Sequence, residues 1–160
     1  MKHIAVFSPD RRYRYTLYRA WQTGLLEPRP GYVQFIGLNP STADEFVNDP
    51  TLRRCIRFAC SWGYSSLYMT NLFAYRATDP RDMKAQSDPV GFENDKWLSK
   101  IAHGASIIVA AWGIHGKYLS RDRQVIELLR SFQLRCLGKV EDGAPKHPLY
   151  LSASAKLIPV

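Results

Sequence analysis

Three apolar runs separated by segments of helical periodicity constrain the fold of this 160-residue chain more than any other feature. The runs occupy residues 32–38 (YVQFIGL), 66–73 (SLYMTNLF) and 106–112 (SIIVAAW). Strands that are apolar along their whole length are typical of parallel sheets, because helices cover both faces of such sheets. The alternation of strand and helix therefore predicts an α/β fold with a parallel sheet and helices on both faces. The length fits a single domain, residues 1–160.

Further strands are predicted on either side of these runs. Residues 3–8 and 13–21 are joined by a turn at Pro9-Asp10, which is the pattern of a β-hairpin. The second of these strands alternates polar with apolar residues, so we expect it to be half exposed. A last short strand is expected at 134–137.

The first predicted helix has the clearest start. Asp49 suits the N-cap, Pro50 suits the first helical position, and Gly63 suits the C-terminal end. The apolar face expected from the helical spacing consists of Leu52, Cys55, Ile56, Ala59 and Cys60.

Two more helices are predicted from a cap and from apolar spacing. Asp88-Pro89 is expected to cap the second helix, whose apolar residues are Trp97, Leu98 and Ile101. The third helix is expected near residues 117–132, with an inward face formed by Val125, Leu128, Leu129 and Phe132.

Composition argues against several classes of protein. No apolar run reaches the roughly 20 residues that span a bilayer, and the N-terminus lacks the apolar region typical of a secretory signal. The three cysteines, Cys55, Cys60 and Cys136, form no Cys-x-x-Cys pair, so neither a disulfide framework nor a zinc site is expected. We expect a cytoplasmic protein with no metal, no other cofactor and no membrane partner.

The charge balance indicates a polyanionic partner. The chain has a formal net charge of +8 at pH 7 and an isoelectric point near 9.6. Such an excess favours nucleic acid first of all, and ordinary surface charge is the alternative explanation. Arginines stand beside aromatic residues at 11–15 and 75–76, which suits phosphate contact next to base stacking.

Unusual polar and aromatic residues follow the ends of the predicted strands. They lie at 37–42, 71–75, 112–117 and in the loop Lys146-His147. Ligands of parallel sheets bind beyond the carboxyl ends of the strands, so we expect these four segments to meet in space.

Each segment also has an ordinary explanation. Asn39-Pro40 could form a plain turn, and Asn71 could be a satisfied amide in the core. Trp112 could serve packing alone, and His147 could be an unremarkable loop residue.

The same segments resemble the motifs of the uracil-DNA glycosylase superfamily. FIGLNPS, which begins at Phe35, is similar to the Gly-x-Asp-Pro or Gly-x-Asn-Pro motif, and its Asn form is similar to the mismatch-specific uracil/thymine branch. LYMTNLFAYRAT is similar to the strand whose Asn reads the base edge, IIVAAWGIHGKYL to the strand ending in Trp-Gly, and KHPLYLSAS to the His-Pro-x-x-Leu-Ser-Ala motif. The resemblance covers residues 35–155 in order. It implies a three-layer α/β/α sandwich with a central, mostly parallel sheet, to which this chain adds an N-terminal β-hairpin.

This resemblance implies an enzyme that hydrolyses the N-glycosidic bond of a flipped, modified or mismatched base in DNA. The candidate catalytic residues are Asn39, at the position that holds the attacking water, and His147, at the position that donates to the base carbonyl. Asn71 would read the base edge, and Phe46 or Phe73 would stack on the base. Because an amide is a poor general base, we expect a slow enzyme. The candidate substrate-binding residues are Gly37, Leu38, Pro40, Ser41, Asn71, Phe73 and Trp112.

The resemblance also implies contacts with DNA. Leu151 falls at the position of the wedge residue that fills the hole left in the duplex, although core packing is the alternative explanation. Backbone amides around Ser41 and Ser152, together with Lys146, would hold phosphates. The candidate nucleic-acid-binding residues are Lys146, Leu151, Ser152, Arg76 and Lys117.

The chain departs from the superfamily pattern at several positions. Ser41 replaces a bulky Tyr that excludes methyl-bearing bases, which implies a pocket open to larger or modified pyrimidines. Leu149 and Tyr150 replace small residues of the wedge loop. Asp44 and Asp49 are expected near the pocket without a counterpart, and for Asp44 the cap of a turn competes with the role of a base.

A nearer resemblance is to an uncharacterised bacterial and phage family, domain of unknown function sixteen-forty-three. Its members share LNPSTAD, then DPT before a basic helix, then NLFA, AWG and HPLYL. This resemblance covers nearly the whole chain and implies no activity.

Two other functions stay open at the level of sequence. The protein could bind nucleic acid or a nucleotide without catalysis, or it could act on free nucleosides or nucleotides. No Gly-rich loop ending in Lys-Ser/Thr is present, which argues against nucleotide hydrolysis of the P-loop type. No Gly-x-Ser-x-Gly elbow is present either, and three scattered cysteines argue against an iron–sulfur cluster.

Overall fold

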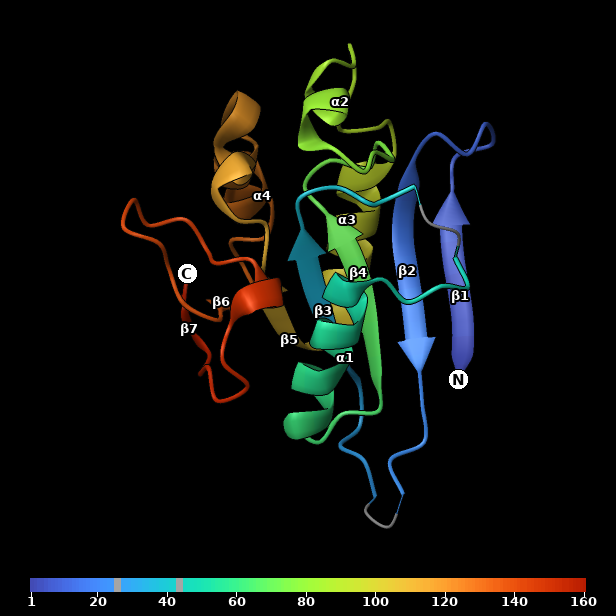
Figure 1. Ribbon diagram of the computed structural model, residues 1–160, viewed down its shortest axis with the longest axis vertical. Coiled ribbons are helices and arrows are strands. Elements are labelled where there is room, and N and C mark those ends of the chain that lie inside the picture. The colour runs from blue at the N-terminus through green and yellow to red at the C-terminus, as the bar shows by residue number, and fades with distance from the viewer. Residues whose placement is uncertain (25–26, 43–44) are drawn as a thin grey trace.

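The computed structural model describes residues 1–24, 27–42 and 45–160 (Figure 1). Its strands are β1 (Lys2–Phe7), β2 (Arg14–Ala20), β3 (Tyr32–Gly37), β4 (Ser66–Asn71), β5 (Ala105–Ala110), β6 (Leu134–Cys136) and β7 (Ile158–Pro159). Its α-helices are α1 (Pro50–Ser61), α2 (Pro80–Lys84), α3 (Asn94–Gly104) and α4 (Arg121–Leu128). Two 3₁₀ segments are η1 (Ile114–Ser120) and η2 (Pro148–Tyr150).

The strands of the described residues form one mixed sheet in the order β1-β2-β4-β3-β5-β6-β7. The four central strands β4, β3, β5 and β6 are parallel to one another. The pairs β1–β2, β2–β4 and β6–β7 are antiparallel, so the parallel arrangement that the sequence predicts is confined to the centre. An α/β fold is confirmed, as is the antiparallel pairing of the two N-terminal strands.

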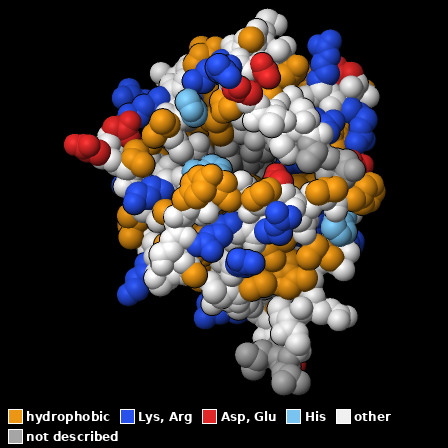
Figure 2. Space-filling view, viewed as in Figure 1, with side chains coloured by type: hydrophobic (Ala, Val, Ile, Leu, Met, Phe, Trp, Pro, Cys, Tyr) orange, Lys and Arg blue, Asp and Glu red, His pale blue; other side chains and the backbone are white. Residues whose placement is uncertain are grey.

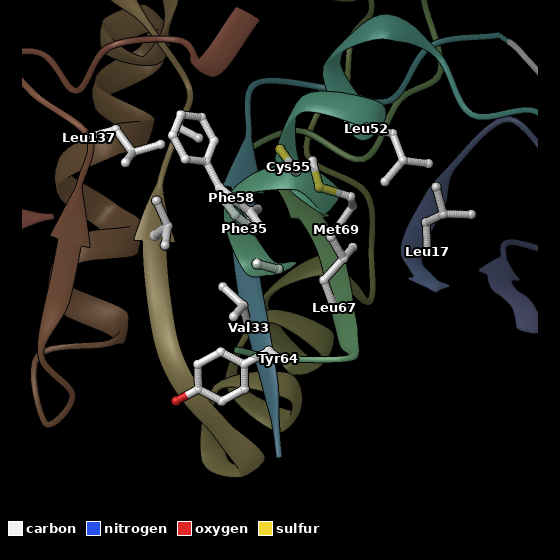
Figure 3. Close-up of a cluster of buried hydrophobic side chains, with 13 residues drawn as sticks. Leu17, Val33, Phe35, Leu52, Cys55, Phe58, Tyr64, Leu67, Met69 and Leu137 are labelled. Carbon is white, nitrogen blue, oxygen red and sulfur yellow. The ribbon is translucent and has the colours of Figure 1, made fainter. Parts of the chain in front are cut away.

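Helices pack against both faces of the central strand β3. Val33 and Phe35 belong to a buried cluster that includes Cys55 of α1 (Figure 3). Ile36, which points to the other face, belongs to a second cluster with Leu98 of α3 and with residues of α4.

This arrangement leaves a crevice between the ends of β3 and β5. The two strands are neighbours, but the chain continues from β3 to α1 and from β5 through η1 to α4. Because α1 and α4 belong to the two different clusters, the loops diverge to opposite faces. Such a point of divergence is where α/β sheets bind their ligands.

Helix α1 begins as the sequence predicts. The Asp49 side chain accepts a hydrogen bond from Leu52 N at 2.8 Å, and Pro50 is the first helical residue. The predicted inward position of Cys60 is wrong, because its side chain is exposed and Phe58 is buried instead. Phe58 stacks on Trp62 with ring centroids 5.7 Å apart.

The predicted start of the next long helix is wrong by several residues. Asp88 caps a turn, since its carboxylate accepts from Gly91 N at 3.1 Å and Gly91 has a φ of +90°. Helix α3 therefore starts at Asn94.

The long helix predicted over residues 117–132 is divided in the structure. Leu119 and Ser120 have positive φ angles, which separate η1 from α4. Leu128 is the last residue of α4, and its side chain is 37% exposed. The predicted inward position of Leu128 is therefore wrong. Helix α2 and strand β7 were not predicted, although Asp79-Pro80 repeats the start signal of α1.

Strand β2 is more buried than its alternating pattern predicts. Residues 14–17 are all buried, because β2 lies inside the sheet between β1 and β4. Within the described ranges, none of the helices combines the length and the apolar character needed to cross a membrane.

Candidate functional site

A cleft of about 380 Å³ opens at the carboxyl ends of the central strands. The face in Figure 2 is hollowed near its middle, and Lys and Arg side chains gather beside the hollow over α1. The segments after β3, β4 and β5 and the loop before η2 all contribute to the walls. The predicted site residues that line the cleft are Gly37, Leu38, Asn39, Pro40, Ser41, Asn71, Trp112 and His147.

Hydrogen bonds join the segment that follows β3 to the segment that follows β4. Leu72 N donates to Gly37 O, and Ala77 N donates to Pro40 O, each at 2.9 Å. The Asn39 side chain adds a bond from Nδ2 to Ala77 O at 2.8 Å. The backbone segments that carry Asn39 and Asn71 are therefore held in a fixed arrangement.

Gly37 and Asn71 lie side by side in the register of β3 and β4. A Cβ atom at position 37 would lie 2.8 Å from Asn71 Oδ1, closer than real contacts allow. The glycine of the Gly-x-Asn-Pro segment is thus the residue that leaves room for the neighbouring carboxamide. Asn71 is only 4% exposed, and its side chain makes no hydrogen bond with any described residue.

The Asn39 carboxamide is hydrogen-bonded within the protein at its nitrogen, while its oxygen is available to a ligand. Its Nδ2 group is used by the carbonyl oxygens of Ala77 and Pro40, at 2.8 and 3.2 Å. Its Oδ1 atom accepts no hydrogen bond from the described part of the chain, although the residue lines the cleft. The amide plane is therefore held in place with an acceptor available for a ligand or a water.

His147 stands at the mouth of the cleft as the N-cap of η2. Its Nδ1 accepts from Leu149 N at 3.2 Å, which assigns the proton of the neutral imidazole to Nε2. Desolvation by the surrounding protein lowers the imidazole pKa below its ordinary value of 6.5, and the negative charge of Asp49 opposes this shift. At neutral pH the ring is a neutral donor through Nε2.

An acidic group also lines the cleft. Asp49 uses Oδ1 to cap α1, and its Oδ2 accepts from Ser41 Oγ at 3.4 Å. Asp44, which the sequence also places near the pocket, lies outside the described residues.

Neither aromatic residue predicted to stack on a base lines the cleft. Phe73 is fully buried in the cluster of α3 and α4, so it cannot contact a ligand. Phe46 is 67% exposed and lies near His3, with ring centroids 6.2 Å apart. Trp112 is the aromatic residue of the predicted set that reaches the cleft wall.

Two predicted DNA contacts are engaged within the protein and lie outside the cleft. Arg76 donates to the carbonyl oxygens of Arg11 and Thr42, at 3.0 and 3.1 Å. Lys117 forms an exposed ion pair with Asp142 at 2.8 Å.

The remaining predicted contacts flank His147 along one loop. Lys146 and Ser152 are exposed. Leu151 packs against the cluster of α1, and its carbonyl oxygen accepts from Arg54. The structure thus places Leu151 in packing, which was the alternative explanation for this residue.

Sequence reasoning missed Arg14 as a cleft residue. It is 6% exposed and lines the wall that β2 contributes. Because the strand was expected to be half exposed, Arg14 was expected to lie at the surface. The run of arginines and aromatic residues at 11–15 was the one sequence feature that indicated a charged site there.

Within the described ranges, no group of three His, Cys, Asp or Glu side chains is placed to hold a metal ion. A family model described as protein of unknown function (DUF1643) matches residues 14–149. The chain belongs to this family. The DUF1643 match spans every residue that lines the cleft, from Arg14 to Pro148. No curated protein and no solved structure is significantly similar to the chain.

The contact between Gly37 and Asn71 predicts a coupled pair of mutations. Gly37→Ala should lower the free energy of unfolding by about 1–3 kcal/mol, because the new methyl group overlaps Asn71 Oδ1. Most of this loss should vanish in an Asn71→Ala background, where the carboxamide is gone. Urea unfolding of the four proteins checks this, and additive effects of the two changes would contradict the proposed contact.

The environment of His147 predicts a titration that depends on Asp49. An NMR titration should give an imidazole pKa below 6.5, and Asp49→Asn should lower it further by removing a negative charge while keeping a capping side chain. Since the folded pKa lies below the unfolded value, the stability contributed by His147 is lost as the pH falls through this range. Glu127→Gln, on α4, is the matched control. A pKa that rises in Asp49→Asn would contradict this account.

Proposed function

We propose that this DUF1643 protein hydrolyses the bond between a base and its deoxyribose in DNA, after the base has turned out of the strand into the cleft. The observation that carries the proposal is the meeting of Asn39, Asn71 and His147 in one cleft with polar atoms left open. The three residues come from the ends of β3 and β4 and from the loop before η2. A flipped base needs this kind of pocket, with donors and acceptors for its edge.

In the proposed reaction the bond between C1′ of the sugar and the base nitrogen breaks, and the base departs with the bonding electron pair. The oxygen of a water molecule bonds to C1′, and the proton that this water loses passes through solvent to the departed base. Asn39 Oδ1 accepts a hydrogen bond from the water and orients it, because the Nδ2 end of the amide is already held by Ala77. An amide takes up no proton at neutral pH, so Asn39 positions the water and a modest rate is expected.

The departing base is stabilised from its other side. His147 donates from Nε2 to a base carbonyl oxygen on which negative charge grows, and its lowered pKa keeps the donor neutral. Asn71 presents both a donor and an acceptor to the base edge, and no residue that the structure describes forms a hydrogen bond with its carboxamide.

The walls of the cleft suit a flat apolar ring. Leu38, Met69, Trp112 and Pro148 supply apolar surface around the polar groups. The volume of about 380 Å³ lies within the usual range for ligand pockets. Ser41 is small, which supports acceptance of a pyrimidine with a substituent on its ring.

We also propose that the fold is the three-layer sandwich of the uracil-DNA glycosylase superfamily, extended by the β1–β2 hairpin. The packing of α1 and of α3 and α4 against opposite faces of β3 supports this arrangement. The order of the motifs from Phe35 to Ser152 supports it independently.

The basic surface beside the cleft is the proposed DNA-binding face. Arg53 and Arg57 are exposed on α1, and Arg54 beside them is half-buried and donates to Leu151 O. Lys and Arg side chains gather over this helix in Figure 2. The exposed loop residues Lys146 and Ser152 flank His147. Phosphate contacts of this kind position the strand, while the cleft reads the base.

The proposal predicts base release that depends on Asn39 and His147. Oligonucleotides carrying uracil, a thymine mismatch, hypoxanthine or a modified pyrimidine should gain alkali-labile abasic sites when incubated with the protein. Asn39→Ala and His147→Ala should each reduce the rate by about 100-fold, which is typical for loss of a group that stabilises the transition state. His103→Ala, an exposed histidine of α3, is the matched control and should keep the full rate.

The same assay separates the alternative functions. Binding to DNA without abasic sites on any oligonucleotide would favour a non-catalytic binder. Affinity for DNA should fall steeply between about 50 and 200 mM salt if several phosphates are contacted. An affinity that does not change with salt would contradict the proposed DNA substrate.

A further inference from the structure

Arg14, Arg19 and Arg76 are close enough to interact electrostatically, and the protein uses the last two internally. Arg19 is fully buried and donates to Asn48 Oδ1 at 2.8 Å, to Tyr18 O at 3.0 Å and to the carbonyl oxygen of Glu45. Arg76, as described above, donates to two carbonyl oxygens of neighbouring loops. Both guanidinium groups hold loops in place.

Arg14 differs from its two neighbours. Its guanidinium makes no hydrogen bond and no ion pair within 4 Å with any described residue, although the residue is only 6% exposed. The backbone of Arg14 is held beside the segment after β4, where Arg14 N donates to Ala74 O at 2.9 Å. The side chain lines the cleft, so its unused donors are directed at the space that a ligand would fill.

Arg14 carries its charge at neutral pH. Burial lowers the pKa of its guanidinium to about 10, and the positive charges of Arg76 and Arg19 act in the same direction. The negative charge of Asp49 opposes this shift. A buried charge without hydrogen bonds is costly, and a bound anion would remove that cost.

We propose that Arg14 binds an oxyanion at the inner end of the ligand that occupies the cleft. A guanidinium offers paired donors that match the two oxygens of a carboxylate or phosphate. Arg14 belongs to β2, the strand next to β4, so its guanidinium reaches the cleft from beside Asn71.

The position of Arg14 favours a base with a carboxylate substituent. The phosphates of a DNA strand stay at the surface of the protein, whereas a flipped base enters the cleft and brings its substituent with it. The oxyanion site itself is independent of the proposed function, and only the carboxylated base as its source rests on that function. A free nucleotide with its phosphate inward is the other source of the same chemistry.

Calorimetry with two ligand pairs tests the site and separates the sources. The wild-type protein should bind uracil-5-carboxylate at least about tenfold more tightly than uracil, the usual scale for a charge-assisted hydrogen bond. This preference should vanish in Arg14→Gln and persist in part in Arg14→Lys. Arg130→Gln, an exposed arginine of α4's C-terminal side that pairs with Glu127, should keep it. An Arg14-dependent preference for uridine 5′-monophosphate over uridine would instead support a phosphate in the site and contradict a DNA substrate.

Thermal unfolding of the ligand-free protein gives a second, independent readout. Arg14→Met should raise Tm by about 2–4 °C, because it removes a largely buried charge that has no hydrogen-bonding partner among the described side chains. Arg121→Met should lower Tm, since the equally buried Arg121 is satisfied by Leu72 O, Gln124 and Asp95. The proposal is overturned if neither ligand pair shows a preference that depends on Arg14, or if Arg14→Met lowers Tm as Arg121→Met does.

Discussion

The close approach of β3 and β4 at Gly37 and Asn71 is the constraint on which the site depends. Because position 37 has no Cβ, the Asn71 carboxamide lies against the neighbouring strand at the cleft. The hydrogen bonds from the segment after β4 to Gly37 O and Pro40 O continue this contact past the strand ends. They also fix the backbone that carries Asn39. A larger residue at position 37 would displace the Asn71 carboxamide and disturb the backbone that carries Asn39.

The charged side chains of the protein have three roles: some hold loops in place, some line the cleft, and some lie exposed at the surface. Arg19 and Arg76 hold loops by donating to carbonyl oxygens, whereas Arg14 reaches the cleft with a guanidinium to which no described residue is hydrogen-bonded. Asp49 caps α1 and opposes the lowering of the His147 pKa by desolvation, so one carboxylate links the start of a helix to the site. The arginines of α1 remain outside, where Figure 2 shows basic side chains beside the hollow. This division is consistent with a protein that meets a polyanion at its surface and a small ring inside.

Much of the central architecture could be predicted from the sequence. Uniformly apolar strands and capped helices indicate an α/β fold, and the rule on strand ends brings Asn39, Asn71 and His147 to one cleft. Local turn chemistry was harder to predict. The φ angles of Leu119 and Ser120 divide a helix that the apolar spacing makes continuous, and Gly91 delays the start of α3. Arg14 could not be identified because its burial depends on where β2 enters the sheet, and no local pattern encodes that position.

A crystal structure of the protein with free uracil tests the central claim most directly. The account predicts a base ring in the cleft, with one edge within hydrogen-bond distance of the Asn71 side chain and a carbonyl oxygen facing His147 Nε2. The Oδ1 atom of Asn39 should lie beside the ring nitrogen that bonds to the sugar, where the attacking water would be held. Uracil bound only outside this cleft, or an occupied cleft in which His147 turns away from the ring, would contradict the account.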